Sequence, residues 1–344
     1  MRKKKIFLGG YLNYTNAQNL NCLSLARHLD KDKFDIYALT THFGDNHIED
    51  LSIKLFHCFR PFICTKYFGF IWGILNCEIL YFPKHQEMPV WILRLVNLLR
   101  KNIFTTIEGN MCNNSYISML DNFGGKKYLT QYFKHIPNIF GITEHLIHHA
   151  NCGVDLHPTP LYLGVEREMF AVSKIRYLSN IVFIGSLIKR KGVDEILDIA
   201  FHFENITFHI IGGGSMREEL EERSTNNMIF YGKLAHNEIE KVLNKADLNI
   251  LLSRSEGFPK VILETASAGV PSIVYSDYGA DEWIENNVNG FVLNTKEEVF
   301  LKIKELIDKP ELLITNSEKV IKLAEKFSWK KQIKVWEQEI ERLR

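Results

Sequence analysis

The sequence has no surplus of either charge and no short internal repeat. Lys and Arg number 42 against 41 Asp and Glu, so the formal net charge is +1. Proteins that bind nucleic acid normally carry a strong basic excess, and this balance gives no electrostatic case for a nucleic-acid partner. With 46% apolar and 24% charged residues, the composition excludes a disordered, collagen-like or coiled-coil chain. The length of 344 residues favours two domains, at roughly 150 residues each.

Cysteine is sparse and forms no C-x-x-C pair. The six cysteines stand at positions 22, 58, 64, 77, 112 and 152. They are too few and too widely spaced for a disulfide scaffold, so we expect free thiols in a reducing cytosol. His145, His148 and His149 could share one helical face, but no Cys or Glu triad accompanies them, and we interpret them as a solvated helix rather than a metal site.

Long hydrophobic runs are absent as well. The basic start followed by the apolar run 6–12 imitates a signal peptide, but the run is short, contains two glycines and has no small-residue cleavage site. It is better interpreted as a first buried strand. The most apolar stretch, 67–82, carries Glu78 and two glycines and is too short to cross a bilayer. We therefore predict no transmembrane helix and a cytoplasmic location, with contact to the inner face of the cell membrane left open.

What the sequence does contain is an alternation of short apolar runs with longer amphipathic ones, which is typical of βαβ units and a parallel sheet. Strands are predicted at 6–9, 35–39, 78–82, 103–107, 138–142, 180–184, 207–211, 228–231, 248–252, 271–275 and 291–293. Helices are predicted at 17–29, 90–101, 193–203, 215–223, 237–246 and 260–268. Both halves open with a hydrophobic strand that runs into glycine, at Ile6–Gly10 and Ile181–Gly185.

These patterns predict an α/β protein with two Rossmann-like domains in series. We place the first at residues 1–165 and the second at 166–325. Residues 326–344 form an amphipathic helix, which we expect to pack across both domains. If the domains face each other, the carboxyl ends of their strands surround one central cleft, where open α/β sheets bind ligands.

The strongest chemical signal is the segment Ser255–Glu264, which follows a buried strand and opens a helix. Pro259 is the residue type favoured at the first helical position, and Gly269 stands where that helix should stop. A helix N-terminus attracts a diphosphate, and Glu256 and Glu264 could accept hydroxyls on either side of it. A nucleotide-sugar has this layout. The alternative is a capped surface helix with two solvated glutamates.

Two further loops follow strands in the second half. In Phe183–Gly192 a strand glycine leads into a basic loop where Lys191 could contact phosphate oxygens, with Lys189 or Arg190 assisting. A solvent-facing loop is the alternative. Ile210–Glu219 loosely resembles a dinucleotide fingerprint, but its glycine spacing is not G-x-G-x-x-G, and we interpret it as a tight turn.

Taken together, these segments resemble family 4 of the retaining GT-B glycosyltransferases, also called glycosyl transferases group 1. The resemblance rests, in order, on Gly185–Gly192, Ile211–Gly214, Phe230–Leu234, Glu256–Glu264, Ala268–Pro271 and the segment from Gly279 to Phe291. The first half matches more loosely, at Gly9-Gly10, Thr143–His145 and Leu163–Val165.

The resemblance implies a GT-B fold and retaining transfer of a sugar from a nucleotide-sugar to an acceptor hydroxyl, in assembly of a cell-surface polysaccharide or glycoconjugate. The first domain would bind a saccharide or lipid-linked acceptor and the second the donor, with no metal and no cofactor. Glu264 would hold the ribose, Glu256 the donor sugar, and Lys191 the departing diphosphate. The donor-binding residues implied are Gly10, Gly185, Ser186, Arg190, Lys191, Gly232, Leu234, Glu256, Gly257, Phe258, Pro259, Val261 and Glu264.

The sequence departs from the family pattern at two positions. Many members carry Arg where this chain has Ser186, and Lys189 or Arg190 could replace its charge. Many carry His where this chain has Glu108. We therefore count Glu108 with Glu256 and Lys191 as the candidate catalytic residues. The D-x-D sequence at Asp30–Asp32 stands at a helix end, and we interpret it as a solvated turn rather than a metal site.

Three questions stay open from the sequence. The aromatic-rich first domain and its apolar helix 90–101 suit either a packed interior or a membrane-facing patch that admits a lipid-linked acceptor. Ser186 and Glu108 also allow a non-catalytic relative that binds a nucleotide-sugar. A third possibility is a GT-B-like epimerase that modifies the sugar nucleotide.

Overall fold

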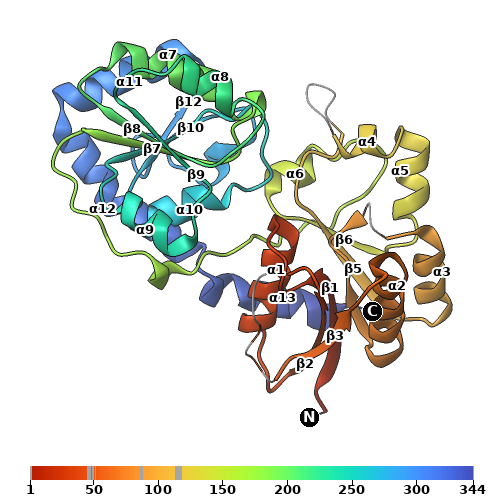
Figure 1. Cartoon of the computed structure of the whole chain (residues 1–344). Helices are drawn as coiled ribbons and strands as arrows, with labels where there is room; N and C mark the ends of the chain where they lie inside the picture. Colours follow the sequence, from red (N-terminus) through yellow and green to blue (C-terminus); the bar gives the residue numbers. More distant parts are fainter. Residues whose placement is uncertain are drawn as a thin grey trace. The chain divides into compact units, whose positions relative to one another are not determined.

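The computed structural model describes residues 2–44, 48, 50, 52–85, 88–112 and 118–343. Within them the chain forms two compact units (Figure 1): unit 1 comprises Met1–Leu163 with Trp329–Arg344, and unit 2 comprises Gly164–Ser328. The sequence analysis placed these two boundaries at 165/166 and 325/326, which is two and three residues away from their positions in the structure. Among the described residues, none of the helices combines the length and hydropathy that a bilayer crossing requires.

Unit 1 contains a parallel sheet of six strands in the order β3-β2-β1-β4-β5-β6. Its strands are β1 (Lys4–Tyr11), β2 (Phe34–Thr41), β3 (Lys54–Cys58), β4 (Ile79–Tyr81), β5 (Asn102–Ile107) and β6 (Asn138–Gly141). Its helices are α1 (Ala17–His28), α2 (Phe62–Asn76), α3 (Val90–Leu98), α4 (Met119–Asn122), α5 (Lys126–Phe133), α6 (Glu144–His148) and α13 (Trp329–Arg342). In Figure 1, α1 and α13 lie on one side of the sheet and α2 and α3 on the other.

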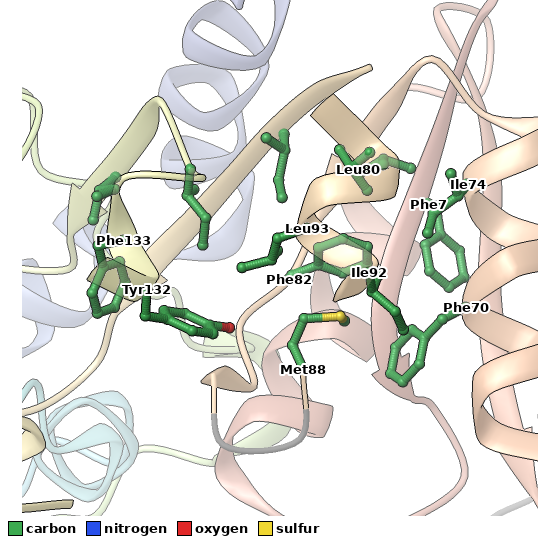
Figure 2. Close-up of a cluster of buried hydrophobic side chains, with 14 of the residues drawn as sticks. Phe7, Phe70, Ile74, Leu80, Phe82, Met88, Ile92, Leu93, Tyr132 and Phe133 are labelled. Carbon is green, nitrogen blue, oxygen red and sulfur yellow. The ribbon is translucent and has the colours of Figure 1, made fainter. Parts of the chain in front are cut away.

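The core of unit 1 combines aromatic with aliphatic side chains (Figure 2). Phe7, Phe70 and Phe82 pack edge to face, with ring centroids 6.0–6.3 Å apart. Helix α2 can approach this closely because Gly73 faces the sheet: a Cβ there would lie 2.5 Å from the Phe7 ring. The mutual burial of these rings explains why the apolar stretch 67–82 is not a membrane span but a helix followed by a strand.

Unit 2 repeats the topology, with a six-stranded parallel sheet in the order β12-β11-β10-β7-β8-β9. Its strands are β7 (Asn180–Ile184), β8 (Thr207–Ile211), β9 (Met228–Gly232), β10 (Leu248–Leu251), β11 (Ser272–Tyr275) and β12 (Phe291–Leu293). Its α-helices are α7 (Val193–His202), α8 (Arg217–Glu222), α9 (His236–Leu243), α10 (Lys260–Ser267), α11 (Lys296–Asp308) and α12 (Pro310–Lys326). In Figure 1, α7, α8 and α11 lie on one face of this sheet and α9, α10 and α12 on the other.

The C-terminal helix α13 belongs to unit 1. Trp329 and Trp336 are buried there: Trp329 stacks on His28 of α1, and the Trp336 indole N–H donates to the carbonyl of Tyr162 at 2.8 Å. The predicted tryptophan-bearing helix therefore exists, and its apolar stripe is buried within unit 1.

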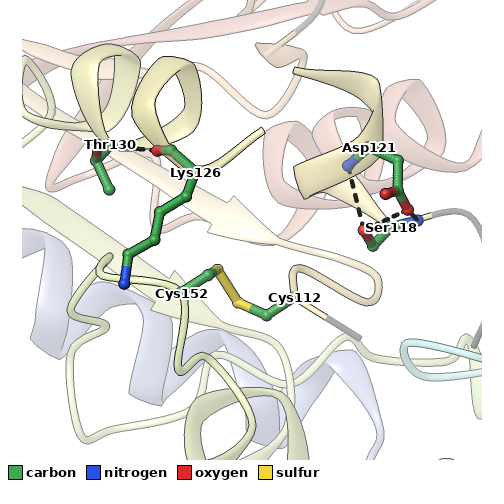
Figure 3. The surroundings of a disulfide bond; sticks show 6 residues. All are labelled: Cys112, Ser118, Asp121, Lys126, Thr130 and Cys152. Carbon is green, nitrogen blue, oxygen red and sulfur yellow. Dashed lines mark hydrogen bonds between the residues drawn. A yellow bond between two sulfur atoms is a disulfide. The ribbon is translucent and has the colours of Figure 1, made fainter. Parts of the chain in front are cut away.

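The expectation of free thiols is wrong for two of the six cysteines. Cys112 and Cys152 form a disulfide with Cα atoms 5.6 Å apart, within the usual range for such bonds (Figure 3). They stand 40 residues apart in the sequence, so spacing gave no signal. They meet because β5 and β6 pair in parallel and the loops that follow these strands leave the same edge of the sheet.

Strand β3 and helices α2, α4, α5, α11 and α12 were not predicted. β3 is an edge strand with its first side chains exposed and only Cys58 fully buried, so it lacks the apolar run that marked the other strands. α2 is apolar on every side, and its sequence consequently shows no 3.6-residue period.

Candidate functional site

Two neighbouring strands of unit 2 bring the strongest sequence signals together. The strand order of its sheet reverses between β7 and β10, which pair in parallel through Leu248 with Ile181 and Asn249 with Val182. The loops after these two strands leave the same edge of the sheet and run in opposite directions. Open α/β sheets bind ligands at the point where two such loops separate. One loop carries Lys191 and the other carries Glu256.

Lys191 and Glu256 form an ion pair at this point. The Lys191 Nζ donates to Glu256 Oε1, and Arg190 approaches the same oxygen at 3.4 Å. The Lys191 and Glu256 side chains are only 13% and 10% exposed. A pair this far removed from water interacts more strongly than a surface pair. The arrangement therefore holds two cations around one carboxylate, and the Lys191–Glu256 pair within it is largely removed from water.

Backbone contacts fix the two loops to each other. The Arg254 N–H donates to the Arg190 carbonyl at 2.9 Å, and the Arg190 side chain donates to the Ser255 carbonyl. Gly192 is essential to this approach, because its φ is +66° and a Cβ would lie 2.3 Å from the Leu252 carbonyl oxygen. Only glycine combines this backbone conformation with this space. The glycine after Lys191 therefore positions the lysine beside Glu256.

Two more predicted loops, those after β8 and β9, lie along the same edge. The Leu187 N–H donates to the Gly213 carbonyl at 3.0 Å, and the Gly212 N–H donates to the Gly232 carbonyl at 2.8 Å. A Cβ on Gly212 would fall 1.8 Å from the Gly185 carbonyl oxygen, which explains the glycines of the tight turn. Next to these contacts, Ser186 is exposed and Leu234 is half-buried. Gly185, Ser186, Gly232 and Leu234 thus share one edge with the Lys191–Glu256 pair.

Helix α10 follows the Glu256 loop. It begins at Lys260 with Pro259 as its N-cap, so the prediction that Pro259 is the first helical residue is off by one position. Gly269 ends it with a φ of +76°, as expected. Phe258 is buried against Trp283 and Phe327, which anchors the start of the helix, while Gly257 and Val261 are half-buried. Glu264 lies half-buried on the second turn.

Sequence reasoning missed a buried tyrosine near Glu256. The Tyr278 side chain is 2% exposed, and its hydroxyl has no hydrogen-bond partner among the described residues. Burial raises its pKa, and the negative charges of Glu256 and Asp277 raise it further. A buried hydroxyl without a partner is costly, so Tyr278 is a candidate to contact a ligand beside Glu256. No spacing in the sequence pointed to it.

Polar side chains also lie at the carboxyl edge of the sheet in unit 1. Glu108 is one of them and follows β5. Asn21 of α1 donates to Glu108 Oε2 at 3.0 Å, and the Thr106 hydroxyl lies 3.3 Å from Oε1. The Thr106 hydroxyl in turn bonds the buried Tyr81 hydroxyl at 2.7 Å. Gly10 lies in β1 against α1, where a Cβ would be 2.6 Å from the Cys22 sulfur. Hydrogen bonds thus fix the orientation of the Glu108 side chain, and Gly10 allows α1 to pack closely against β1.

Two residues after β4 were also missed. His85 is 7% exposed, and its Nε2 lies 3.2 Å from the Thr106 carbonyl oxygen. A carbonyl can only accept, so Nε2 carries the proton. Burial lowers the pKa of His85 to about 4, and the ring is therefore neutral near pH 7. Lys84 is 5% exposed, with its Nζ 4.5 Å from the centroid of the Tyr11 ring.

The candidate metal sequences are not assembled into a site. Asp30 accepts from the Asp32 N–H at 2.8 Å in the turn before β2, at the opposite edge of the sheet from Glu108. The His145 and His149 rings stack with centroids 4.0 Å apart. In the part of the chain that the structure describes, no group of three or more His, Cys, Asp or Glu side chains could hold a metal ion.

Comparison with known sequences matches a family model and several named relatives. Residues 167–327 match the model of the family described as glycosyl transferases group 1, which confirms the predicted resemblance. An uncharacterized glycosyltransferase of Methanocaldococcus jannaschii is 29% identical over 177 residues, 50% of each chain. The α-galactosylglucosyldiacylglycerol synthase of Streptococcus pneumoniae is 30% identical over 194 residues, 52% of this chain and 50% of that protein. The O-antigen biosynthesis glycosyltransferase WbnH of Escherichia coli is 29% identical over 136 residues, 38% of each. The chain spans about half the length of the first curated relatives it matches, or less.

Solved structures share the fold of the whole chain. HepE of Anabaena, in complex with UDP and glucose, matches with a TM-score of 0.79 at 15% identity, over 99% of this chain and 100% of that one. Sucrose-phosphate synthase of Thermosynechococcus elongatus matches with a TM-score of 0.80 at 10% identity, over 99% of both chains. At these identities the likeness shows the fold alone, and it confirms the predicted α/β GT-B class.

Proposed function

We propose, from the match of residues 167–327 to the glycosyl transferases group 1 family, that this chain is a retaining glycosyltransferase. It moves a sugar from a nucleotide-diphosphate-sugar to an acceptor hydroxyl. The observation that carries the proposal is the Lys191–Glu256 pair, with Arg190 beside it, at the strand-order reversal of unit 2. A diphosphate needs cations and backbone donors, and a sugar needs a carboxylate. This edge offers the cations and the carboxylate together.

In the structure the Glu256 carboxylate neutralises Lys191. A nucleoside diphosphate carries more negative charge than one carboxylate and competes for Lys191 and Arg190. Glu256 is then released to accept hydroxyl hydrogens of the donor sugar. As the bond to the anomeric carbon breaks, negative charge grows on the leaving diphosphate and the fixed cations stabilise it more strongly. We propose that these protein cations suffice, so that activity persists in EDTA without a metal cofactor.

We assign the ribose hydroxyls to Glu264 and the base to the backbone at Gly232–Leu234. The remaining donor contacts fall to the loop at Gly185 and Ser186, to Gly257–Pro259 and to Val261. Support for a nucleotide-sugar comes from HepE, whose structure was determined with UDP and glucose.

In unit 1 we propose that Glu108 supplies the polar group that many relatives take from histidine. As a carboxylate it accepts from a sugar or acceptor hydroxyl, or stabilises positive charge at the anomeric carbon. Asn21 and Thr106 hold it in one orientation for either role. Gly10, which lies in β1 rather than in a loop, stays a proposed donor-binding residue of the same unit.

For the acceptor we propose a saccharide or a lipid-linked saccharide of cell-surface glycoconjugate assembly, with the protein on the cytoplasmic side of the membrane. Two relatives support this class: one is named an α-galactosylglucosyldiacylglycerol synthase and another an O-antigen biosynthesis glycosyltransferase.

The first experiment is thermal shift with UDP, GDP and ADP, followed by transfer and donor-hydrolysis assays with sugars of the stabilising nucleotide. A ligand at 100 times its dissociation constant stabilises by about 2.7 kcal/mol, which is readily measured. Lys191→Ala should then lower kcat more than it raises KM, because its charge acts mainly in the transition state. The matched control is Lys189→Ala, an exposed lysine of the same loop, which should change both little. Stabilisation by no nucleotide, or an equal effect of the two variants, would contradict the proposal.

A further inference from the structure

Helix α2 is apolar on the side that faces water as well as on the side that faces the sheet. Its buried residues are Thr65, Gly69, Phe70, Gly73 and Ile74. On the opposite side, Ile63, Phe68 and Leu75 are 67%, 60% and 63% exposed. A surface helix normally turns charged and polar residues outward. The outward side of α2 therefore carries large apolar residues where a purely structural helix would carry mostly polar ones.

The exposed apolar surface continues onto α3. Trp91 and Leu98 of that helix are 49% and 79% exposed. The Tyr67 ring of α2 and the Trp91 ring of α3 touch, with centroids 5.7 Å apart, so the two helices present one continuous surface. We call this surface, formed by Ile63, Phe68, Leu75, Trp91 and Leu98, the α2–α3 face. Contiguous exposed patches of large apolar side chains mark interaction sites rather than ordinary protein surface.

The charged residues of the two segments that carry the α2–α3 face are all basic, although the exposed Glu78 follows α2 and Asp35 lies 3.7 Å from Lys54. Residues 52–77 and 88–107 contain no Asp or Glu, although the whole chain has nearly equal numbers of acidic and basic residues. The basic residues in these two ranges are Lys54, Arg60, Lys66, Arg94, Arg100 and Lys101. Arg94 is exposed one turn from Trp91 and from Leu98, and Lys66 lies over the Tyr67 ring at 4.9 Å. Burial, Lys134 and Arg94 together lower the pKa of the neighbouring His135, which is consistent with a positive local potential.

We propose that the α2–α3 face binds the surface of a bilayer that contains anionic phospholipid. The apolar side chains enter the boundary between headgroups and acyl chains, and the arginines and lysines lie at the level of the lipid phosphates. A second copy of this chain fits the charges less well. A symmetric contact places a patch against itself, and the cations of α2 and α3, such as Lys66 and Arg94, would then face one another. The inference stands apart from the proposed sugar transfer, since it involves neither nucleotide nor acceptor.

Co-sedimentation of the full-length protein with vesicles tests this inference. Phosphatidylcholine vesicles should bind weakly, and vesicles of phosphatidylcholine and phosphatidylglycerol in equal parts should bind more tightly, with salt reducing the difference. Phe68→Ser combined with Leu98→Ser should weaken binding at least 10-fold, which corresponds to about 1.4 kcal/mol of lost apolar burial. The matched control is Phe201→Ser on α7 of unit 2, whose side chain is 64% exposed and should not matter.

A second pair of variants separates charge from hydrophobicity. Arg94→Glu should weaken binding to anionic vesicles at least fivefold, since each surface cation contributes about 1 kcal/mol. Lys304→Glu on α11, an exposed lysine of unit 2, carries the same charge change and should have no such effect. All variants should keep the wild-type thermal stability and nucleotide affinity, which rules out misfolding and keeps the result independent of the transfer reaction.

Three outcomes would overturn the inference. One is equal binding to neutral and anionic vesicles. Another is a loss of binding in Phe201→Ser or Lys304→Glu that matches the loss in the α2–α3 variants. The third is a wild-type dimer in light scattering that Leu98→Ser converts to a monomer while vesicle binding is unchanged, which would assign the face to a second copy.

Discussion

Gly192 offers the most direct test of how the site in unit 2 is built, because its replacement by alanine adds a single methyl group. That methyl would lie 2.3 Å from the Leu252 carbonyl oxygen, and Gly192 has a φ of +66°. The left-handed conformation costs an alanine about 1–2 kcal/mol. Relief of the overlap requires the two loops to separate, at an overpacking cost of about 1–3 kcal/mol. Gly192→Ala should therefore destabilise unit 2 by about 2–5 kcal/mol.

Gly269 is the matched control within the same unit. Its φ is +76°, but the nearest atom to an added Cβ is a methyl of Val172 at 3.2 Å, which can move. Gly269→Ala should cost about 1–2 kcal/mol. Denaturant unfolding followed by tryptophan fluorescence gives both values, and calorimetry gives the affinity for the nucleotide that stabilises the protein. Only Gly192→Ala should lose affinity, because the displaced strand end leads directly to Glu256. Equal destabilisation of the two variants, with affinity kept, would refute the account of the loop.

Three other variants test single residues. Glu264→Ala should weaken nucleoside-diphosphate binding by about 1.5–3 kcal/mol in calorimetry, since the ribose loses a charged acceptor, and unchanged affinity would remove Glu264 from that role. Glu108→Gln should lower turnover at least 10-fold, about 1.4 kcal/mol, at unchanged nucleotide affinity, whereas normal turnover would make Glu108 a structural residue. Burial lowers the pKa of His85 from 6.5 to about 4 in the folded state. Between these two pH values the unfolded state binds a proton and the folded state does not, so the free energy of unfolding decreases as the pH falls from 6.5 to about 4. His85→Gln should remove up to about 3 kcal/mol of that pH dependence in denaturant titrations; an unchanged slope would show that His85 is not the buried group.

The sequence allowed the two-domain α/β architecture to be predicted because buried parallel strands are short and nearly all apolar. Leu248–Leu251 and Ile181–Ile184 are examples, and each is followed by a loop with glycine. The same reasoning failed for β3, whose outward side chains include Lys54 and Leu55, and for α2, whose apolar residues cover the whole helix. Periodicity reveals a helix or an edge strand only when one of its sides is buried and the other is exposed to solvent.

For the site, the sequence indicated which residues matter but not how they meet. Lys191 and Glu256 are far apart in the chain, and only the pairing of β7 with β10 makes them partners. The Cys112–Cys152 disulfide was not predicted from the sequence for the same reason, since it depends on β5 lying beside β6. Tyr278 gave no signal at all, because its importance comes from burial beside Glu256 rather than from any motif.

The two units carry different charged groups at equivalent edges of their sheets, and we expect this difference to separate nucleotide binding from turnover. Each sheet reverses its strand order between its first and fourth strands. In unit 2 that edge holds the two cations, Lys191 and Arg190, with Glu256, which suits the charge of a diphosphate. In unit 1 the corresponding edge has a neutral histidine, and a carboxylate, Glu108, follows the next strand. A carboxylate repels a diphosphate but stabilises positive charge at a sugar carbon. Nucleotide affinity should therefore respond mainly to variants of unit 2, and Glu108→Gln should act on turnover. A Glu108 variant with altered nucleotide affinity would break this division of roles.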